Sequence, residues 1–494
     1  ILSLFLYAVV HILFNGFLWL NHIPSPLFLD VMEGTVLQHV RQLVEGRYIY
    51  PVPTPEYVPL AYNALYYVIS APFVWVFGLV LPVLRFVAVL GMAGTGLMLF
   101  AVMHQKTRSR WWALMAVGLF AAAYYAMDTY LDNAHSDSWF LFTALLGTYL
   151  VGENRSRAWN LAGVLMLVAS FWFKQHGAIF AIGGVLYLTW RDGFHRSIIY
   201  WMVAIVFGPL LYLTGGRLLF GPYFHYFTWQ VPSQWSTVDI HTATRLVKLV
   251  ISKYPLLAAS AMLGVGWTAL RRRPSLTVWH VQLVSAILTG VMGALDSGSA
   301  DNVFIPMGVW FILMGVWGLH DLTEAFRTDL AFQISLAILV MSFGVFLYNP
   351  LSVIRPEIAY LAYADFVSFL RGLDGTVYAP GLGQLEADYV LYPAAHWVAL
   401  EDMIRGPGRD TDNHPLIRQL TEPAIDPKGP AYILTSYPLE FDPILGFLND
   451  YYVLDNDLGS RFEPLRVLPK RFDHRWPRYL YRYAPEEAQA RSNS

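Results

Sequence analysis

The sequence predicts an α-helical membrane protein that crosses the bilayer many times. Of its 494 residues, 56% are hydrophobic and only 14% are charged, whereas about a quarter of the residues of a soluble domain are charged. Apolar runs of near-spanning length recur from residue 1 to residue 348. The segments between these runs alternate in charge, as inner and outer loops of a polytopic protein do.

Composition also excludes several classes of function. The net charge of -2 leaves no surplus of Lys and Arg to neutralise nucleic-acid phosphates. The chain contains no Cys, which excludes disulfides, thiolate catalysis and Cys-ligated metals. It carries no Walker loop or dinucleotide fingerprint either. Any chemistry is therefore expected from side chains near the membrane surface.

The hydropathy pattern predicts about eleven spans, each near the length of a tilted membrane helix. They are expected at 1–20, 82–103, 111–127, 138–151, 159–173, 177–190, 197–214, 246–270, 276–295, 302–319 and 330–348. No small-residue cleavage pattern follows the first run, which predicts an anchor and not a signal peptide. Because the sequence opens inside this run, we expect further residues before it.

Charge predicts which segments share a side of the membrane. The basic or mixed segments are 104–110, 153–157, 191–196, 271–274 and 320–329, and the positive-inside rule places them in the cytoplasm. The other set then lies outside: 30–58, 128–137, 174–176, 215–245, 296–302 and everything after Tyr348. This assignment requires that 62–78 does not cross the membrane. We expect an integral protein of a bacterial inner (plasma) membrane, with its site facing the periplasm.

Three regions follow from the change in composition along the chain. Residues 1–350 form the transmembrane domain, with a first outer loop at 21–80. Residues 351–485 read as a small extracytoplasmic α/β domain, because short apolar pieces alternate with Pro, Gly and charge. Its expected strands are 376–379, 432–435, 451–454 and 478–483, and its expected helices include 397–404 and 439–448. The polar tail 486–494 is expected to be disordered.

The first outer loop carries the most informative stretch, 30–59. Apolar side chains recur at helical spacing over 30–45, which predicts an amphipathic helix on the membrane surface. Gly46 ends it, and four prolines between 51 and 59 force an irregular segment. The aromatic-rich segment 62–77 is expected to be a second interfacial helix.

Asp30 and Glu33 are the candidate catalytic residues. They lie three apart at a helix start, so both carboxylates can face one cavity. Ionisable groups at the membrane edge are costly and usually serve a function. The alternative is a capping box, with Asp30 as N-cap and Glu33 at N3, which has the same spacing.

A polar cluster follows at 128–137, with Asp132, His135 and Asp137 as candidates for contacting sugar hydroxyls or orienting the catalytic carboxylate. The same three side chains are the candidates for a divalent metal site, although their spacing matches no standard ligand motif. A solvated loop is the plain alternative.

The next candidates are cationic or polar groups suited to an anion. Lys174, Gln175 and His176 form a short outer turn between two spans, where an ammonium and two hydrogen-bond donors suit a lipid-linked phosphate. Snorkelling of Lys174 to headgroups is the alternative. Arg85, in the first turn of a span, suits the same anion or a structural pairing with Asp30 or Glu33.

Two further outer segments carry possible substrate contacts. Asn302 opens a span and can hydrogen-bond a substrate or cap its helix. The aromatic loop 221–236 can line a groove for a sugar or a prenyl chain, and it equally suits the aromatic belt of the bilayer.

In order and sidedness these residues resemble the C-type (GT-C fold) membrane glycosyltransferases, in particular the protein O-mannosyltransferase and aminoarabinose lipid A transferase branch. The matching elements are Glu33, Gly46, Tyr50 and Pro51; Tyr62 to Tyr66; Val76 to Gly78; Arg85; His135 and Asp137; and Phe173 to Gln175. The resemblance spans about residues 1–350. It departs at Met32, where the branch commonly has Asp before Glu, and at Ala64, where relatives tend to have Pro.

The resemblance implies transfer of a sugar from a polyprenyl-phosphate donor to a glycan, lipid or protein acceptor at the outer face. Asp30 or Glu33 would be the general base, and Lys174 with Arg85 would stabilise the phosphate. Tyr62 belongs to the expected sugar and acceptor contacts, with Asp132, His135, Asp137 and Asn302. The resemblance names no certain cofactor, and a divalent metal stays open.

Two other classes of function fit part of the pattern. A transporter or flippase of a lipid-linked or anionic substrate would show internal repeats and charged helices near the bilayer midplane, whereas these ionisable residues gather at one face. A receptor or assembly scaffold would depend on 351–494 and leave the earlier polar segments without a role.

Overall fold

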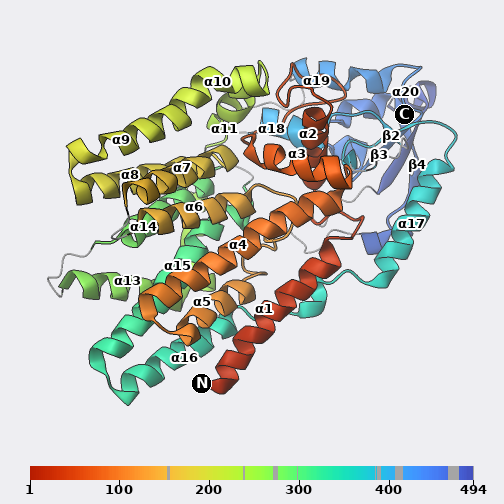
Figure 1. The fold of residues 1–494 in the computed structure, drawn as a ribbon. Coiled ribbons are helices and arrows are strands. Elements are labelled where there is room, and N and C mark those ends of the chain that lie inside the picture. Colours follow the sequence, from red (N-terminus) through yellow and green to blue (C-terminus); the bar gives the residue numbers. More distant parts are fainter. Residues whose placement is uncertain are drawn as a thin grey trace.

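The structure is a computed structural model of the chain. It describes residues 1–152, 156–236, 240–270, 276–296, 299–383, 385, 391–405, 415–465 and 478–492. The described residues form a helical domain and a smaller α/β domain at one end of it (Figure 1).

The helical domain contains a helix for every apolar run expected from the sequence. These helices are α1 (Leu2–His22), α4 (Leu81–Thr107), α5 (Arg110–Ala122), α6 (Asp137–Val151), α7 (Arg157–Phe173), α8 (Gly177–Asp192), α9 (Phe194–Ile205), α10 (Leu211–Phe220), α12 (Ile240–Lys253), α13 (Pro255–Leu270), α14 (Val278–Leu295), α15 (Ile305–Phe326) and α16 (Asp329–Val345). Ser109 and Ser156 cap α5 and α7, each accepting a hydrogen bond from a backbone N–H of the first turn.

The expected count of eleven spans is not confirmed. Among the described residues, five helices are long and apolar enough to cross a membrane, or up to seven if two bent helix pairs each count as one span. One of these pairs bends by 92° between α12 and α13. Helices α5, α6 and α7 have 13, 15 and 17 residues, fewer than the roughly 20 that a straight span needs.

Close helix packing depends on small residues. A Cβ at Gly147 of α6 would lie 2.9 Å from the carbonyl oxygen of Gly163 on α7, so the two backbones meet where neither residue has a side chain. Small residues commonly allow such approach between membrane helices.

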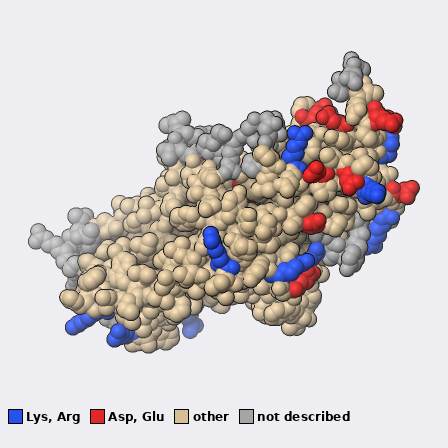
Figure 2. Space-filling model, turned by 90° about the horizontal axis from the view of Figure 1, so that it is seen from above, with Lys and Arg blue, Asp and Glu red and all other residues tan. Residues whose placement is uncertain are grey.

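Three of the charged turns that the sequence predicts on one side of the membrane lie at the same end of the helical domain. The turns at 104–110, 191–196 and 320–329 lie at the end of the helical domain away from the α/β domain (Figure 1). Figure 2 shows Lys and Arg at that end, whereas most of the visible Asp and Glu lie over the opposite end. The basic segments 153–155 and 271–274 lie outside the described residues.

The described residues of the C-terminal domain include a five-stranded sheet in the order β2-β1-β3-β5-β4. Its strands are β1 (Val377–Tyr378), β2 (Leu391–Tyr392), β3 (Tyr432–Thr435), β4 (Tyr452–Asp457) and β5 (Tyr479–Tyr483). Strands β2, β1 and β3 run parallel, and β5 and β4 continue the sheet antiparallel. Its helices are α17 (Glu357–Arg371), α18 (Trp397–Ile404), α19 (Pro415–Thr421) and α20 (Pro485–Ser492).

Two expectations for this domain are wrong, and one of its helices is not predicted by the sequence pattern. The helix expected at 439–448 is two short 3-10 turns, Leu439–Phe441 and Gly446–Asp450, because Pro443 between them cannot continue a helix. Helix α17 was not expected from the sequence. The tail forms helix α20, whose N-terminal Glu486 and Glu487 suit the helix dipole.

The first outer loop lies between the two domains. It contains α2 (Glu33–Val44) and α3 (Leu65–Phe77). Residues 33–40 of α2 are buried on every side, which corrects the expected surface helix with one exposed face. The C-terminal domain covers the polar face: Gln38 Nε2 donates to Ala394 O at 3.2 Å, and a Cβ at Gly383 would lie 3.1 Å from Gly34 O.

Candidate functional site

A cavity of about 420 Å³ lies where the two domains meet. Its polar wall is contributed by segments far apart in the sequence: Asp30, Tyr62, Tyr130, Lys174, Gln175, His176, Thr228, Asp296, Asn302, Glu401, Asp402 and Arg405. Six of the eleven residues expected from the sequence line it: Asp30, Tyr62, Lys174, Gln175, His176 and Asn302. The outer segments expected to share one side of the membrane therefore do converge.

Asp30 is a buried carboxylate on the wall of this cavity, with 5% of its surface exposed. Its Oδ2 accepts a hydrogen bond from Tyr130 Oη at 2.9 Å, and its Oδ1 accepts one from Met32 N at 2.9 Å. Burial raises the pKa of Asp30, while His135 and these hydrogen bonds oppose the increase. The capping box is wrong, because α2 begins at Glu33 with Met32 as its N-cap.

Glu33 points away from the cavity, in contrast to Asp30. Its Oε1 and Oε2 accept hydrogen bonds from Ala134 N at 2.8 Å and Leu29 N at 2.6 Å, and both also pair with Arg85. Burial alone would raise the pKa of Glu33, but the charge of Arg85 and these hydrogen bonds lower it. The two neighbouring carboxylates are thus pushed in opposite directions, as in sites where one carboxyl group exchanges protons and the other stays charged.

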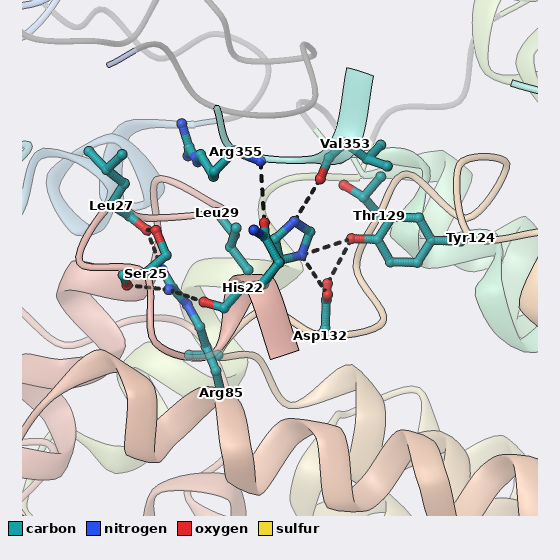
Figure 3. Close-up of polar contacts among 12 residues, drawn as sticks. His22, Ser25, Leu27, Leu29, Arg85, Tyr124, Thr129, Asp132, Val353 and Arg355 are labelled. Carbon is teal, nitrogen blue, oxygen red and sulfur yellow. Dashed lines mark hydrogen bonds and ion pairs between the residues drawn. The ribbon is translucent and has the colours of Figure 1, made fainter. Parts of the chain in front are cut away.

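Arg85 is a structural clamp and does not line the cavity. All five N–H groups of its guanidinium are used: Nε and Nη2 donate to Glu33, and the remaining three donate to the carbonyl oxygens of His22, Ser25 and Leu27. Figure 3 shows this chain segment folded around Arg85. The expected phosphate contact by Arg85 is therefore replaced by its structural alternative.

Asp132 likewise belongs to a buried link and not to the cavity wall. Its Oδ2 lies 2.7 Å from His22 Nδ1, and its Oδ1 accepts from Tyr124 Oη at 2.9 Å. His22 Nε2 in turn donates to Val353 O at 2.7 Å (Figure 3). This chain of contacts ties the end of α1 to the polar loop and to the segment entering the C-terminal domain.

Asp137 lies behind the cavity wall and holds three other site residues. Lys174 Nζ donates to its Oδ1 at 2.6 Å, and Asn302 Nδ2 donates to its Oδ2 at 3.2 Å. His135 Nδ1 contacts Oδ2 as well, and the contact is an ion pair when the imidazole is protonated. The His135 ring also packs edge-on against Tyr62, with ring centroids 5.0 Å apart. Asp137 and His135 therefore position the wall residues instead of lining the cavity.

Gln175 and His176 complete the wall around Lys174. Gln175 Nε2 donates to the carbonyl oxygens of Ala61 and Thr228, at 2.9 and 3.0 Å, which ties three outer segments together. Burial, reinforced by the charge of Lys174, lowers the pKa of His176 to about 4. At neutral pH this imidazole offers a hydrogen bond and no charge.

The C-terminal domain supplies residues that the sequence reading missed. Arg405, just beyond α18, lies with its guanidinium carbon 5.1 Å from the ring centroid of Trp235 and pairs with Asp402 Oδ1 at 3.2 Å. Trp235 Nε1 donates to Asp402 O at 2.9 Å. The only sequence signal is the charged spacing of 401, 402 and 405 around one helix end.

Two carboxyl groups of the wall have raised pKa values. Burial raises the pKa of Asp402 to about 6. Burial also raises the pKa of Asp296 to about 6, although the nearby cations Lys174 and Arg405 oppose it. Asp296, Lys174 and Arg405 all line the same cavity.

The three candidate metal ligands, Asp132, His135 and Asp137, do not form one site. Asp132 contacts His22, whereas Asp137 contacts Lys174, Asn302 and His135. In the part of the chain that the structure describes, no three His, Asp or Glu side chains are grouped as ligands of one ion. From the aromatic loop, Trp229 and Trp235 line the cavity, while Phe224 and Phe227 are buried in the helical domain.

No family model and no curated protein matches the sequence. Solved structures do match. An oligosaccharyltransferase of Archaeoglobus fulgidus, in a complex with Zn and sulfate, aligns with a TM-score of 0.51 and 13% identity over 90% of this chain and 71% of that one.

ArnT from Cupriavidus metallidurans also matches, in two states. In the apo state it aligns with a TM-score of 0.43 and 18% identity, over 73% of this chain and 68% of that one. Bound to undecaprenyl phosphate it aligns with a TM-score of 0.44 and 15% identity, over 81% of this chain and 69% of that one. The likeness to the archaeal enzyme is one of fold, the GT-C fold that the resemblance of the sequence implies.

Proposed function

We propose that the chain is a glycosyltransferase that moves a sugar from a polyprenyl-phosphate donor to a hydroxyl group of a glycan, lipid or protein acceptor. One observation carries the proposal: a buried carboxylate with a raised pKa, Asp30, lines the same cavity as two cations, Lys174 and Arg405. The shared fold supports this reaction class.

Asp30 is the proposed general base. Glycosyl transfer passes through an oxocarbenium-like state, and the attacking hydroxyl must lose its proton. Of the two carboxylates considered from the sequence, only Asp30 lines the cavity. Its Tyr130 hydrogen bond fixes the carboxylate orientation, and its raised pKa makes it a better proton acceptor than an exposed Asp.

Lys174 and Arg405 are the proposed ligands of the phosphate leaving group. Charge develops on the phosphate oxygen as the bond to the sugar breaks, and fixed cations stabilise it. Asp137 holds the ammonium of Lys174, and the Trp235 ring and Asp402 hold the guanidinium of Arg405, so both cations are oriented before substrate enters. Gln175 and neutral His176 add hydrogen bonds beside them.

The remaining wall residues are proposed to hold the sugar and the acceptor. Asn302 and Tyr62 present an amide and a phenol to the cavity, and both are positioned by the pair His135 and Asp137. In the transfer step the acceptor oxygen bonds to the anomeric carbon, its proton passes to Asp30, and the lipid phosphate leaves with the electron pair of the broken bond.

The proposed orientation places the cavity and the C-terminal domain on the outer face of a bacterial inner membrane. The basic turns at 104–110 and 191–196 lie at the opposite end of the helical domain, which supports this orientation through the positive-inside rule.

The test is sugar transfer by the purified chain in lipid nanodiscs. It is offered polyprenyl phosphates carrying single pentoses or hexoses, with envelope extract as acceptor. The variant Asp30→Asn keeps the size of the side chain, and Asp374→Asn, an exposed Asp of the C-terminal domain, is the matched control. We expect wild type and the control to consume one donor, and Asp30→Asn to be slower by about 10²–10⁴-fold with an unchanged melting temperature.

Two results would overturn the proposal. If wild type consumes no donor, the transport of a lipid-linked or anionic substrate becomes the better hypothesis. If folded Asp30→Asn turns over as fast as wild type, Asp30 is not the base.

A further inference from the structure

A second cavity, of about 220 Å³, lies within the C-terminal domain. Its wall includes Pro380 and Gly381, which follow β1, and Thr435 to Tyr437, where β3 ends. It therefore lies outside the carboxyl ends of two parallel, hydrogen-bonded strands.

The topology marks this place as a ligand crevice. In the sheet order β2-β1-β3, the chain leaves β1 for a strand on one side and later forms β3 on the other side. The loops after β1 and β3 thus diverge at a switch point, and open α/β sheets bind their ligands in such crevices. Both loops contribute to the wall of the cavity.

The side chains in the crevice suit a neutral sugar. Trp397, Tyr437 and Phe441 present aromatic surface, and Phe441 is 72% exposed, so its ring is accessible to a ligand. Trp397 lies over Gly381, where a Cβ would be 3.2 Å from the indole. An aromatic face packs against the C–H face of a sugar ring, while carboxylates accept hydrogen bonds from its hydroxyls.

The charged side chains on the wall further limit the class of ligand. The wall carries two carboxyl groups, those of Glu401 and Asp442, and its described lining residues include no Lys or Arg. Asp442 Oδ1 accepts hydrogen bonds from the backbone N–H groups of Ile444 and Leu445, which fixes its carboxylate at the crevice. The two carboxylates disfavour an anionic ligand, such as a lipid phosphate or an acidic sugar, relative to a neutral one.

Helix α18 separates this crevice from the first cavity. Val398 and Asp402 face the first cavity, and Trp397 faces the second. Glu401 lines both. The two cavities therefore adjoin at the Glu401 side chain.

We propose that the crevice is an acceptor subsite, which binds neutral sugar units of a glycan whose next unit enters the first cavity past Glu401. The acceptor is then a glycan and not a protein or a lipid. The transfer step of this inference rests on the function proposed above, whereas the binding of glycan does not.

The test measures binding and transfer separately. Full-length protein in nanodiscs, without donor, is applied to a printed array of neutral linear gluco-, manno-, galacto- and arabino-oligosaccharides. The variants are Phe441→Ala and Tyr437→Ala, with Leu454→Ala as the control because it removes an exposed apolar side chain from β4, outside the crevice. All three positions are exposed, so folding is preserved and is verified by the melting temperature.

We expect wild type and Leu454→Ala to bind one class of glycan equally, and each crevice variant to bind it about tenfold more weakly. In the transfer assay the same variants should raise the acceptor KM about tenfold, with kcat and the donor KM unchanged. Glycan binding that is lost in these variants supports the inference even if no donor is ever consumed. The inference is overturned if wild type binds no glycan, or if Phe441→Ala and Tyr437→Ala bind and use glycan as wild type does.

Discussion

Arg85 donates two hydrogen bonds to Glu33, from Nε to Oε1 at 2.9 Å and from Nη2 to Oε2 at 2.6 Å. Both side chains are buried, and the other three guanidinium N–H groups hold the carbonyl oxygens of the segment leaving α1. The pair therefore fixes the path of the chain that carries Asp30 to the cavity.

Glu33→Gln should destabilise the fold. It leaves the charge of Arg85 buried without a counterion, a change that typically costs about 3–5 kcal/mol. Thermal unfolding of the purified protein in one detergent measures it. Glu45→Gln, at an exposed pair with Arg47, is the matched control and should change stability by less than about 0.5 kcal/mol. A Glu33→Gln protein that melts like wild type would show that the pair is not needed for the fold.

Arg405→Met should weaken donor use without unfolding the domain. Loss of a charged hydrogen-bond donor to phosphate is expected to raise the donor KM by roughly ten- to a hundredfold. Steady-state kinetics with a fixed acceptor measures it, with Arg371→Met on the exposed end of α17 as control. An unchanged donor KM would remove Arg405 from the phosphate site.

The sequence predicts the helices and the convergence of the outer segments well, because apolar length and loop charge determine both. It does not predict which side chains line the cavity, because contacts between residues far apart in the sequence determine this. Asp30 and Glu33 read alike, yet only the irregular path from 23 to 32 around Arg85 decides which one lines the cavity.

The sequence does not predict that the C-terminal domain contributes residues to the cavity wall either. Arg405 lies beside Trp235, and Asp402 O accepts from the same indole, across 167 positions of sequence. The spacing of its apolar residues predicts an exposed polar face for helix α2, yet this face is buried and its Gln38 donates to Ala394 O of the other domain. Local periodicity contains no information on such contacts.

Protonation of Asp402 should add stability to the folded protein as pH falls from about 6 to about 4. The pKa of Asp402 is raised from 3.8 to about 6 by burial, so in this window the folded state binds a proton that the unfolded state does not. The stability that protonation of Asp402 contributes is gained as pH falls through 6, is fully present below 4 and is lost as pH rises again. The contribution is on the order of 3 kcal/mol.

Melting temperatures of wild type and Asp402→Asn across this window measure the effect. The variant should be more stable than wild type at pH 7, and this difference should shrink as pH falls from about 6 to about 4, because Asp296 and His176 titrate alike in both proteins. Asp374→Asn, at an exposed site, should keep the wild-type profile. Parallel profiles for wild type and Asp402→Asn would contradict the assignment.

Tyr130→Phe should move the acid limb of the transfer reaction to higher pH. A general base works only when deprotonated, so kcat/KM falls as pH drops through the pKa of Asp30, which burial raises above its ordinary 3.8. The Tyr130 hydroxyl donates to the charged carboxylate and thereby opposes that increase. Its removal should raise the pKa of Asp30 further.

Asp296 and Asp402 titrate near pH 6 in the same cavity, so the displacement of the acid limb in the variant, and not the position of the limb, identifies Asp30. The profiles of wild type, Tyr130→Phe and the control Tyr451→Phe, which lies in the C-terminal domain outside the cavity, decide the matter. A limb that stays in place or moves to lower pH in Tyr130→Phe would assign the base to another group.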